Sequence, residues 1–268
     1  MLSVCATPIG NLDDVTLRVL AELAEAELVL CEDTRHTRRL LDRHRIRAKL
    51  LSYHEHNEAE RTAALLPRLV AGERMALVSD AGLPGISDPG ARLVGAAADA
   101  GVQVTVLPGA SAVETALVAA GFAAERYQFL GFLPRGESAL AALWKELATW
   151  PWPAVAFESP RRLPATLASL ARFDAGRQLA VARELTKRHE EVTRGAAGDL
   201  AERFAQAPKG EVTLVVGGAG DAAPTLGADD AAEVVVALVA EGVSRRRAAE
   251  LVARLTGLSR KQLYDMSL

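Results

Sequence analysis

Five loop-like segments of the sequence combine glycine, proline and small or charged residues in a way that suits ligand binding. Each follows a short apolar run typical of a β-strand, and together they are Thr7–Asn11, Ser79–Gly85, Pro108–Ala112, Glu158–Arg162 and Arg183–Lys187. Glycine lets the backbone approach a ligand closely, and a small residue at a helix start presents free N–H groups to a carboxylate or phosphate. Because loops after parallel strands meet at one edge of a sheet, we expect the five to converge on one cleft. The alternative for any single loop is an ordinary tight turn.

Several familiar chemistries lack their sequence signatures in this chain. No G-x-G-x-x-G follows the first apolar run, and neither G-x-x-x-x-G-K-[ST] nor G-x-S-x-G occurs, which argues against a dinucleotide oxidoreductase, a P-loop hydrolase and an α/β-hydrolase. The only metal-like cluster is His54-Glu55-His56, which an extended backbone would present with both imidazoles on one side. A polar rim of the cleft is the favoured interpretation, so we predict no metal.

Short apolar runs alternate with helix-like segments along most of the chain, which predicts an α/β fold built of parallel βα units. We expect an N-terminal α/β domain over residues 1–113, a second over 114–222, and a linker with a helix-turn-helix-like tail over 223–268. A helix should begin near Val15, with Asp13 or Asp14 as its cap. In the tail, an i, i+3, i+4, i+7 stripe is expected to be buried, and it comprises Ala248, Leu251, Val252 and Leu255. The segment Gly217–Asp230 has the composition of a linker.

The composition sets the class of protein. A chain of 268 residues, 50% hydrophobic and 24% charged, can bury a large core in about two domains. Its longest stretch without a charged residue is the 14 residues Ala100–Val113, so no membrane span is expected, and the N-terminus has no basic run before an apolar one. We therefore expect a cytoplasmic protein. Cys5 and Cys31 lie in apolar runs and are predicted to be small core residues.

Two basic segments stand out against a net charge of −3. Residues 34–49 hold seven lysines or arginines and one acid, and residues 244–268 hold six against two, giving local charges of +6 and +4. Such segments predict phosphate contacts and therefore salt-dependent binding of nucleic acid. The alternative is that each is a solvated helix face.

Taken together, the loops resemble a known family. The segments that carry the resemblance run in order through nearly the whole chain, and they are Ala6–Leu12, Cys31–Arg35, Ser52–Glu58, Ser79–Gly90, Pro108–Ala112, Phe129–Pro134, Glu158–Leu163 and Arg183–Lys187. They are similar to those of the bacterial small-subunit ribosomal RNA cytidine-2′-O-methyltransferases of the tetrapyrrole methylase superfamily. The resemblance implies two α/β domains with S-adenosylmethionine in the cleft between them, usually a homodimer, and as substrate a decoding-region cytidine in free RNA or in the assembled small ribosomal subunit.

The resemblance also implies a set of cofactor contacts in both domains. Matching the family pattern residue by residue gives Pro8, Ile9, Gly10, Asp80, Leu83, Ser111 and Ala112 in the first half, and Phe157, Ala182 and Leu185 in the second. Asp80 would accept a hydrogen bond from the cofactor amine. Its alternative role is to cap the turn that follows it.

The acceptor side rests on hypotheses drawn from the residues themselves. Lys187 is our first catalytic candidate, either as a cation that stabilises a developing alkoxide or, with a lowered pKa, as a base, and Glu55 is the second. The residues expected to bind substrate are Arg35, Tyr53, His54, Asn57 and Arg161, with Tyr53 placed to stack on one nucleoside. As alternatives, Glu32 and Asp33 cap the helix near Thr34, Arg161 is solvated, and Lys187 pairs with Glu190 or Glu191.

Two other functions compete with RNA methylation. A tetrapyrrole or protein-side-chain methylase of the same superfamily would need a roomy apolar pocket in place of basic rims, and the two basic segments count against it. A non-catalytic RNA-binding protein with a vestigial cleft is opposed by the intact glycine-bearing loops.

Overall fold

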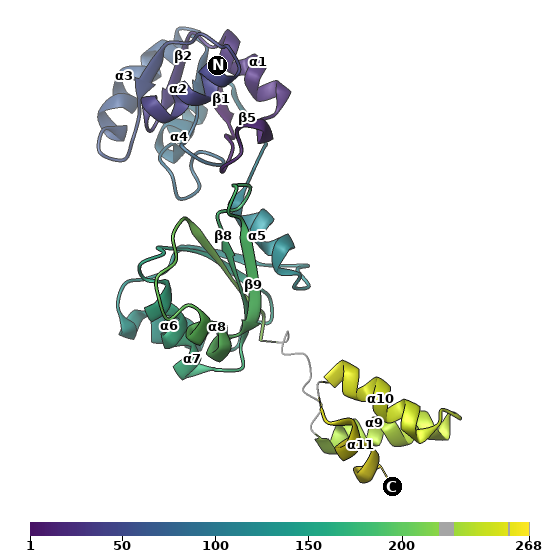
Figure 1. Ribbon diagram of the computed structural model, residues 1–268. Helices are drawn as coiled ribbons and strands as arrows, with labels where there is room; N and C mark the ends of the chain where they lie inside the picture. The colour runs from purple at the N-terminus through teal and green to yellow at the C-terminus, as the bar shows by residue number, and fades with distance from the viewer. Residues whose placement is uncertain (220–227, 257, 268) are drawn as a thin grey trace. The chain divides into compact units, whose positions relative to one another are not determined.

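The computed structural model describes residues 1–219, 228–256 and 258–267, with the backbone alone at 228–230. The chain forms two compact units, Met1–Ala219 and the residues from Gly220 on, and each is described by itself. The first unit contains two lobes, each built on a five-stranded sheet (Figure 1). Of the expected linker Gly217–Asp230, residues 220–227 lie outside the described part of the chain.

The N-terminal lobe is the parallel α/β layer that the sequence predicted. Its sheet has the order β3-β2-β4-β1-β5 with all neighbours parallel, and the strands are β1 (Leu2–Cys5), β2 (Leu28–Cys31), β3 (Leu50–Ser52), β4 (Met75–Leu77) and β5 (Val104–Leu107). The helices of this lobe are α1 (Leu17–Glu25), α2 (Thr34–Arg43), α3 (Glu58–Val70) and α4 (Ala91–Asp99). Burial of β1, β2 and β4 on both faces explains their continuous apolar sequence.

The first helix begins later than expected. Asp13 and Asp14 lie in a short 3-10 helix, Leu12–Asp14, and α1 starts at Leu17. The cap is Thr16, whose hydroxyl accepts a hydrogen bond from the Val19 N–H at 3.2 Å. The predicted start near Val15 was therefore wrong, because a threonine one residue further on supplies the capping oxygen.

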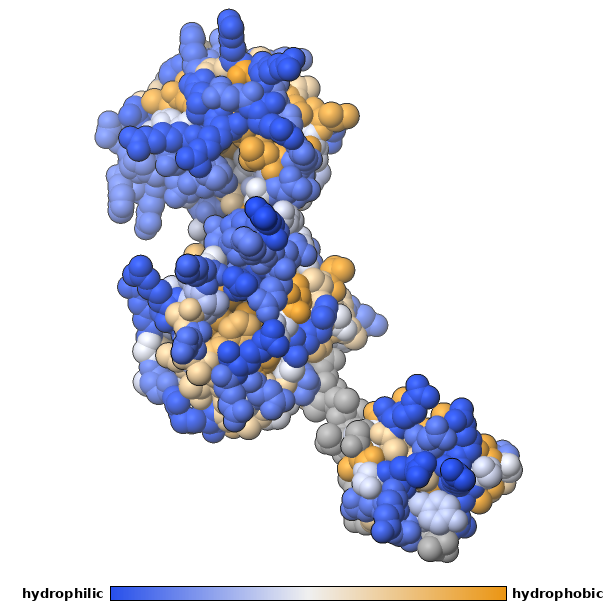
Figure 2. All heavy atoms as spheres, in the orientation of Figure 1, coloured by the Kyte–Doolittle hydropathy of each residue, from blue (hydrophilic) through white to orange (hydrophobic). Residues whose placement is uncertain are grey.

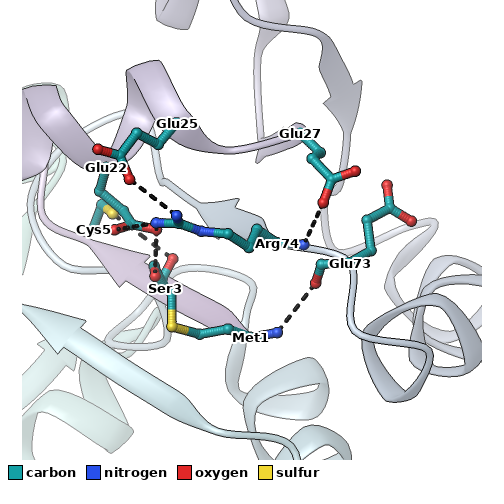
Figure 3. Close-up of polar contacts among 8 residues, drawn as sticks. All are labelled: Met1, Ser3, Cys5, Glu22, Glu25, Glu27, Glu73 and Arg74. Atoms are coloured by element: carbon teal, nitrogen blue, oxygen red, sulfur yellow. Dashed lines mark hydrogen bonds and ion pairs between the residues drawn. The ribbon is translucent and has the colours of Figure 1, made fainter.

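A polar cluster ties α1 to the start of β4 (Figure 3). Arg74 forms ion pairs with Glu22 at 3.2 Å and Glu25 at 3.0 Å, and Glu22 also accepts a hydrogen bond from the Ser3 hydroxyl at 2.9 Å. Beside this cluster Cys5 is fully buried, and burial raises the pKa of its thiol to about 12. Both cysteines are buried and unpaired, so their predicted role as core residues is confirmed.

The second lobe differs from the predicted parallel pattern. Its sheet has the order β6-β7-β10-β8-β9, where only β6 and β7 pair in parallel. The strands are β6 (Gln128–Phe132), β7 (Ala154–Glu158), β8 (Gln178–Arg183), β9 (Glu191–Ala196) and β10 (Val212–Val216). The sequence did not predict β9, because this edge strand reads EVTRGA and contains no fully buried residue.

Helices cover both faces of the second sheet. Helix α5 (Ala112–Ala120) packs against Val155, Ala180 and Val215. The opposite face carries α6 (Glu137–Leu147), α7 (Leu163–Phe173) and α8 (Ala197–Arg203), which bury Trp144 and Leu167 among others. Figure 1 shows α5 apart from α6, α7 and α8 within this lobe. The strands alternate between the two cores, as a sheet covered on both sides requires.

The second unit is a small helical bundle of α9 (Ala228–Ala240), α10 (Arg245–Thr256) and α11 (Arg260–Met266). Val235, Ala248, Val252 and Leu263 form its core. Leu255, expected in the buried stripe, is 86% exposed, because it lies in the last turn of α10 after the residues that pack against the other helices. Within the described residues, no helix is long and apolar enough to cross a membrane.

Candidate active site

One cavity of about 550 Å³ lies between the loops of the two lobes. All five loops singled out in the sequence contribute to its lining, through Ile9, Asp80–Leu83, Ser111 and Ala112, Glu158–Pro160, and Glu184 and Leu185. The rest of the wall comes from Ile86–Asp88, Val113, Phe132, Phe157, Ala182 and residues 210–213. The loops therefore converge as expected, and the volume is within the range of small-molecule sites.

The loop after β1 joins the two lobes beside this cavity. Thr7 and Gly82 exchange backbone hydrogen bonds of 2.8 and 3.1 Å, which fixes the loop against the segment after β4. At its other end, the Asn11 N–H donates to the Thr186 hydroxyl at 3.0 Å, in the turn after β8. A Cβ built on Gly10 would lie 2.5 Å from Cγ of Lys187. Only glycine lets these two segments approach so closely.

Backbone strain is concentrated near the cavity. Four non-glycine residues of the described chain have positive φ, and three of them, Ser87, Glu184 and Thr186, lie in the loops around the cavity. Each such conformation costs on the order of 1 kcal/mol or more. Neighbouring contacts must hold these turns in place, as when Glu190 accepts a hydrogen bond from the Thr186 N–H at 2.5 Å.

The described lining residues include five carboxylates and no lysine, arginine or histidine. The acids are Asp80, Asp88, Glu158, Glu184 and Glu211. Burial raises the pKa of Asp88 to about 6, helped by the charges of Glu32 and Asp80. In contrast, a hydrogen bond from the Glu211 backbone N–H lowers the pKa of Glu184. The cavity is therefore negatively charged and suits a cationic ligand.

Glu158 forms a buried hydrogen-bond network at the end of β7. Its carboxylate, with a fully buried side chain, accepts from the Ser159 N–H at 2.6 Å, Nε of Arg162 at 2.7 Å and the Thr166 hydroxyl at 2.6 Å. Arg162 in turn donates to the Leu133 carbonyl at 2.7 Å. This network fixes the end of β6, next to Phe132.

Eight of the ten cofactor contacts expected from the sequence line the cavity. They are Ile9, Asp80, Leu83, Ser111, Ala112, Phe157, Ala182 and Leu185. Pro8 and Gly10 are absent from the lining, and Gly10 instead packs against the turn that holds Lys187. Asp80 has a structural contact too, because it accepts a hydrogen bond from the Asp33 N–H at 3.1 Å.

Neither catalytic candidate from the sequence lines the cavity. Lys187 Nζ lies 2.9 Å from Glu211 and 3.1 Å from Glu184. Burial acts to lower the pKa of Lys187, but its bonds to these two acids raise it overall. The lysine stays protonated, so its expected role as a base is wrong, and the carboxylates that pair with it are not the predicted Glu190 or Glu191. Glu55 is exposed and lies outside the lining.

The stacking role expected for Tyr53 is wrong. The Tyr53 side chain is fully buried in the core of the N-terminal lobe, where its hydroxyl contacts Thr62 at 2.9 Å and Glu58 at 3.2 Å. Burial raises the pKa of this hydroxyl to about 12. A residue held in this way offers no ring face to a nucleoside.

The other expected substrate contacts occupy the rims of the N-terminal lobe and of β7. Asn57 is engaged in its own loop, where its side-chain oxygen accepts from the His54 N–H at 2.9 Å, and the His54 ring contacts that of His56. Arg35 is exposed in the first turn of α2, which Asp33 caps as the alternative had it. Arg161 is exposed and outside the cavity lining. Among the described residues, no group of three or more metal-type ligands occurs.

Sequence reasoning missed two residues of the cavity wall with chemical potential. Phe132 is an aromatic side chain that remains 64% exposed, and Asp88 is a half-buried acid. Both lie inside motifs quoted above, FLGFLP and SDAGLPGISDPG, but a motif does not show which of its side chains face a cavity.

Comparison with known families defines the class of this protein. Residues 1–201 match the model of the tetrapyrrole (corrin/porphyrin) methylases, and residues 226–268 match the RsmI C-terminal HTH domain. The solved methyltransferase CobJ is 22% identical, with a TM-score of 0.62 over 81% of this chain and 94% of that one. A Thermus thermophilus uroporphyrin-III C-methyltransferase, complexed with S-adenosyl homocysteine, is 19% identical with a TM-score of 0.56 over 81% and 96%. The expected two-lobed methylase fold is confirmed.

Curated relatives define the family more narrowly. A Synechocystis protein is 42% identical over 100% of this chain and 97% of its own length, and a Micromonospora olivasterospora protein is 43% identical over 97% and 83%. Both are named ribosomal RNA small subunit methyltransferase I. The chain belongs to this family of methylases, which confirms the resemblance seen in the motifs, and with it an enzyme that depends on S-adenosylmethionine.

Proposed function

We propose that the protein transfers the methyl group of S-adenosylmethionine to the ribose 2′-oxygen of a cytidine in small-subunit ribosomal RNA. The observation that carries this proposal is the acidic cavity, in which eight of ten family-pattern positions meet. The relatives named as small-subunit rRNA methyltransferases support RNA as the acceptor. The homodimer and the cytoplasmic location stay predictions.

The cavity fits the methyl donor by charge and by shape. The donor carries a positive sulfonium and an ammonium group, for which Asp80 and the other carboxylates supply the opposite charge. Its carboxylate matches the start of α5, where Ser111 leaves the first N–H groups without a side-chain cap. Apolar side chains such as Leu83 and Phe157 would contact its neutral parts. Bound donor would supply an activated methyl group that needs no metal to leave.

The protein's contribution is to align two reacting atoms and to handle one proton. Loops from two lobes enclose the cavity, so a ligand in it is held from both sides. Alignment of this kind supplies on the order of 7–11 kcal/mol of the barrier when the reacting atoms approach in line. The 2′-hydroxyl is a poor nucleophile while protonated, so a base must accept its proton as the bond forms.

Helix α2 supplies the basic surface for RNA. All seven basic residues of segment 34–49 are exposed, and Arg43 alone among them, within the described residues, has an ion-pair partner, Asp13 at 2.9 Å. Figure 2 shows mostly hydrophilic residues on the face of the N-terminal lobe where α2 lies. Unpaired arginines on one helix favour phosphate contacts over a structural role.

We expect Arg38→Gln on α2 to weaken RNA binding by roughly threefold to tenfold. Loss of one phosphate contact should also reduce the slope of log affinity against log salt by about 1. Filter binding of small-subunit RNA between low and physiological salt measures both quantities. Lys145→Gln on α6, also an exposed basic residue, is the matched control and should leave the slope unchanged. Equal slopes for wild type and Arg38→Gln would remove α2 from the interface.

Phe132 takes the role that the sequence assigned to Tyr53. It lies at the cavity wall with its ring in edge contact with Phe157, at a centroid distance of 5.5 Å, and it is 64% exposed. Arg162 holds the adjacent Leu133 carbonyl, so the ring is presented from a fixed strand end. An exposed aromatic ring beside a catalytic cavity suits stacking on the acceptor base.

We expect Phe132→Ala to lower kcat/KM for RNA by about tenfold, because stacking on one base contributes ~1–3 kcal/mol. The rise should be in the KM for RNA, with donor affinity unchanged, and Phe132→Trp should restore activity. Phe173→Ala, at an exposed phenylalanine outside the cavity lining, is the control. A normal KM for Phe132→Ala would exclude the stacking role.

Methyl transfer from labelled S-adenosylmethionine tests the proposed function. Wild-type protein is incubated with isolated small ribosomal subunits, free small-subunit RNA or a porphyrin precursor. We expect label in the RNA of one or both RNA samples and none in the porphyrin. Label in the porphyrin would favour a tetrapyrrole methylase, and no transfer to any acceptor would favour a non-catalytic RNA-binding protein.

A further inference from the structure

Asp88 lies on the loop between β4 and α4, where that loop reaches the second lobe. The loop residue Ser87 has a left-handed backbone, with φ of 62°, and a Cβ built on Gly131 would lie 3.6 Å from its hydroxyl. Gly131 directly precedes Phe132, so Asp88 and Phe132 line the cavity from segments that approach each other. Asp88 is thus on the side of the cavity where the proposed acceptor base would stack.

The other four carboxylates of the cavity are committed to protein partners. Glu184 and Glu211 share the ammonium group of Lys187 at 3.1 and 2.9 Å. Glu158 accepts three hydrogen bonds, one of them from Arg162. Asp80, which also lies among the expected cofactor contacts, accepts from the Asp33 N–H. A carboxylate bound to a cation or to several donors is a weak proton acceptor.

Asp88 is in a different electrostatic environment. In the described structure it has no ion pair, and the groups that act on it are Glu32 after β2, Asp80 after β4 and the hydroxyl of Ser79. Burial and the two acids raise its pKa, while the Ser79 hydroxyl lowers it, with a net value of about 6. Such a carboxylate is ionised at neutral pH and is still basic enough to accept a proton.

We propose that Asp88 is the general base that accepts the proton of the ribose 2′-hydroxyl during methyl transfer. The inference rests on the proposed function. As the bond between the 2′-oxygen and the methyl carbon forms, the carbon–sulfur bond breaks and its electron pair stays on sulfur. The hydroxyl proton passes to the Asp88 carboxylate and from there to solvent. Neither an oxidant nor a metal is needed for this balance.

The test compares Asp88→Asn with wild type and with Asp99→Asn, an exposed aspartate at the end of α4. Methyl transfer to RNA is measured under saturating donor, and donor affinity by calorimetry. We expect Asp88→Asn to lower kcat by roughly 10²- to 10⁴-fold, with the KM for RNA and the Kd for the donor within threefold of wild type. Asp99→Asn should behave as wild type.

The pH profile distinguishes a base from a merely structural residue. Wild-type kcat/KM should fall as the pH is lowered through about 6, because protonated Asp88 accepts no proton. Glu32→Gln removes a charge that raises the Asp88 pKa, so this limb should move to lower pH, which tests the assignment even if Asp88→Asn is unstable. The limb should be absent from Asp88→Asn.

Two results overturn the assignment of Asp88 and leave the proposed function intact. One is an Asp88→Asn enzyme that turns over within threefold of wild type, and the other is an acid limb that Glu32→Gln does not move. If the wild-type protein binds donor but methylates no RNA, the proposed function fails and the role of Asp88 with it.

Discussion

Gly10→Ala is expected to weaken donor binding by at least tenfold. The new Cβ would lie 2.5 Å from Cγ of Lys187, 2.8 Å from the Thr186 hydroxyl and 3.0 Å from the Leu185 carbonyl, so the turn after β8 must move. That turn carries Leu185, and the loop that carries Gly10 also carries Ile9, so the move separates two parts of the cavity wall. A shift of this kind removes contacts on both sides of the ligand.

Calorimetric titration with S-adenosylhomocysteine measures this effect without turnover. Gly95→Ala is the matched control, because Gly95 lies inside α4 and a Cβ there meets no atom within 4 Å. It should leave donor affinity unchanged and raise stability by up to about 1 kcal/mol, since alanine is the better helix former. A Kd for Gly10→Ala within twofold of wild type would show that the cavity does not depend on this contact.

Glu158→Ala is expected to lower the melting temperature by about 10 °C. The substitution leaves the Ser159 N–H, the Thr166 hydroxyl and the half-buried Arg162 without their acceptor. Removing one partner of a buried ion pair costs roughly 3–5 kcal/mol, and each kcal/mol shifts the melting temperature by roughly 2–4 °C in a protein of this size. Differential scanning calorimetry gives the value directly.

The control for Glu158 is Asp13→Ala, which breaks an arginine–carboxylate pair of similar length at the surface. The side chains of Arg43 and Asp13 are 57% and 62% exposed, so this pair should contribute about 0–1 kcal/mol. We expect a change of no more than a few degrees. A drop for Glu158→Ala no larger than that for Asp13→Ala would contradict the structural role of the buried network.

Charge is divided between the inside and the outside of the site. The cavity presents carboxylates and no basic residue among its described lining, whereas α2 presents exposed arginines. A cationic methyl donor and a polyanionic RNA would thus each meet a surface of opposite sign. The net charge of −3 conceals this division, because it sums both surfaces.

The N-terminal sheet and the five loops were predictable from sequence because their signals are local. A fully buried parallel strand reads as a continuous apolar run, and the glycine-bearing loop follows it directly. The edge strand β9 has no such run, and the antiparallel pairing of β10 depends on partners distant in sequence. Those parts of the second lobe required the structure.

Side-chain roles were less predictable, because each depends on a distant partner. Tyr53 looked available for stacking until Thr62 and Glu58 were seen to hold its hydroxyl in the core. Lys187 looked like a base, but Glu211, from the start of a later strand, keeps it protonated. No local pattern in the sequence indicates which acid of the 79–90 segment is left without a cation.

The most direct measurement is the identity of the methylated nucleoside. Small-subunit RNA labelled by the wild-type protein is digested to nucleosides and analysed by mass spectrometry. Methyl transfer to a ribose in the proposed cavity predicts label in 2′-O-methylcytidine, and none after Gly10→Ala at low donor concentration. Label on a base, on another nucleoside, or in no RNA at all would contradict the proposed reaction.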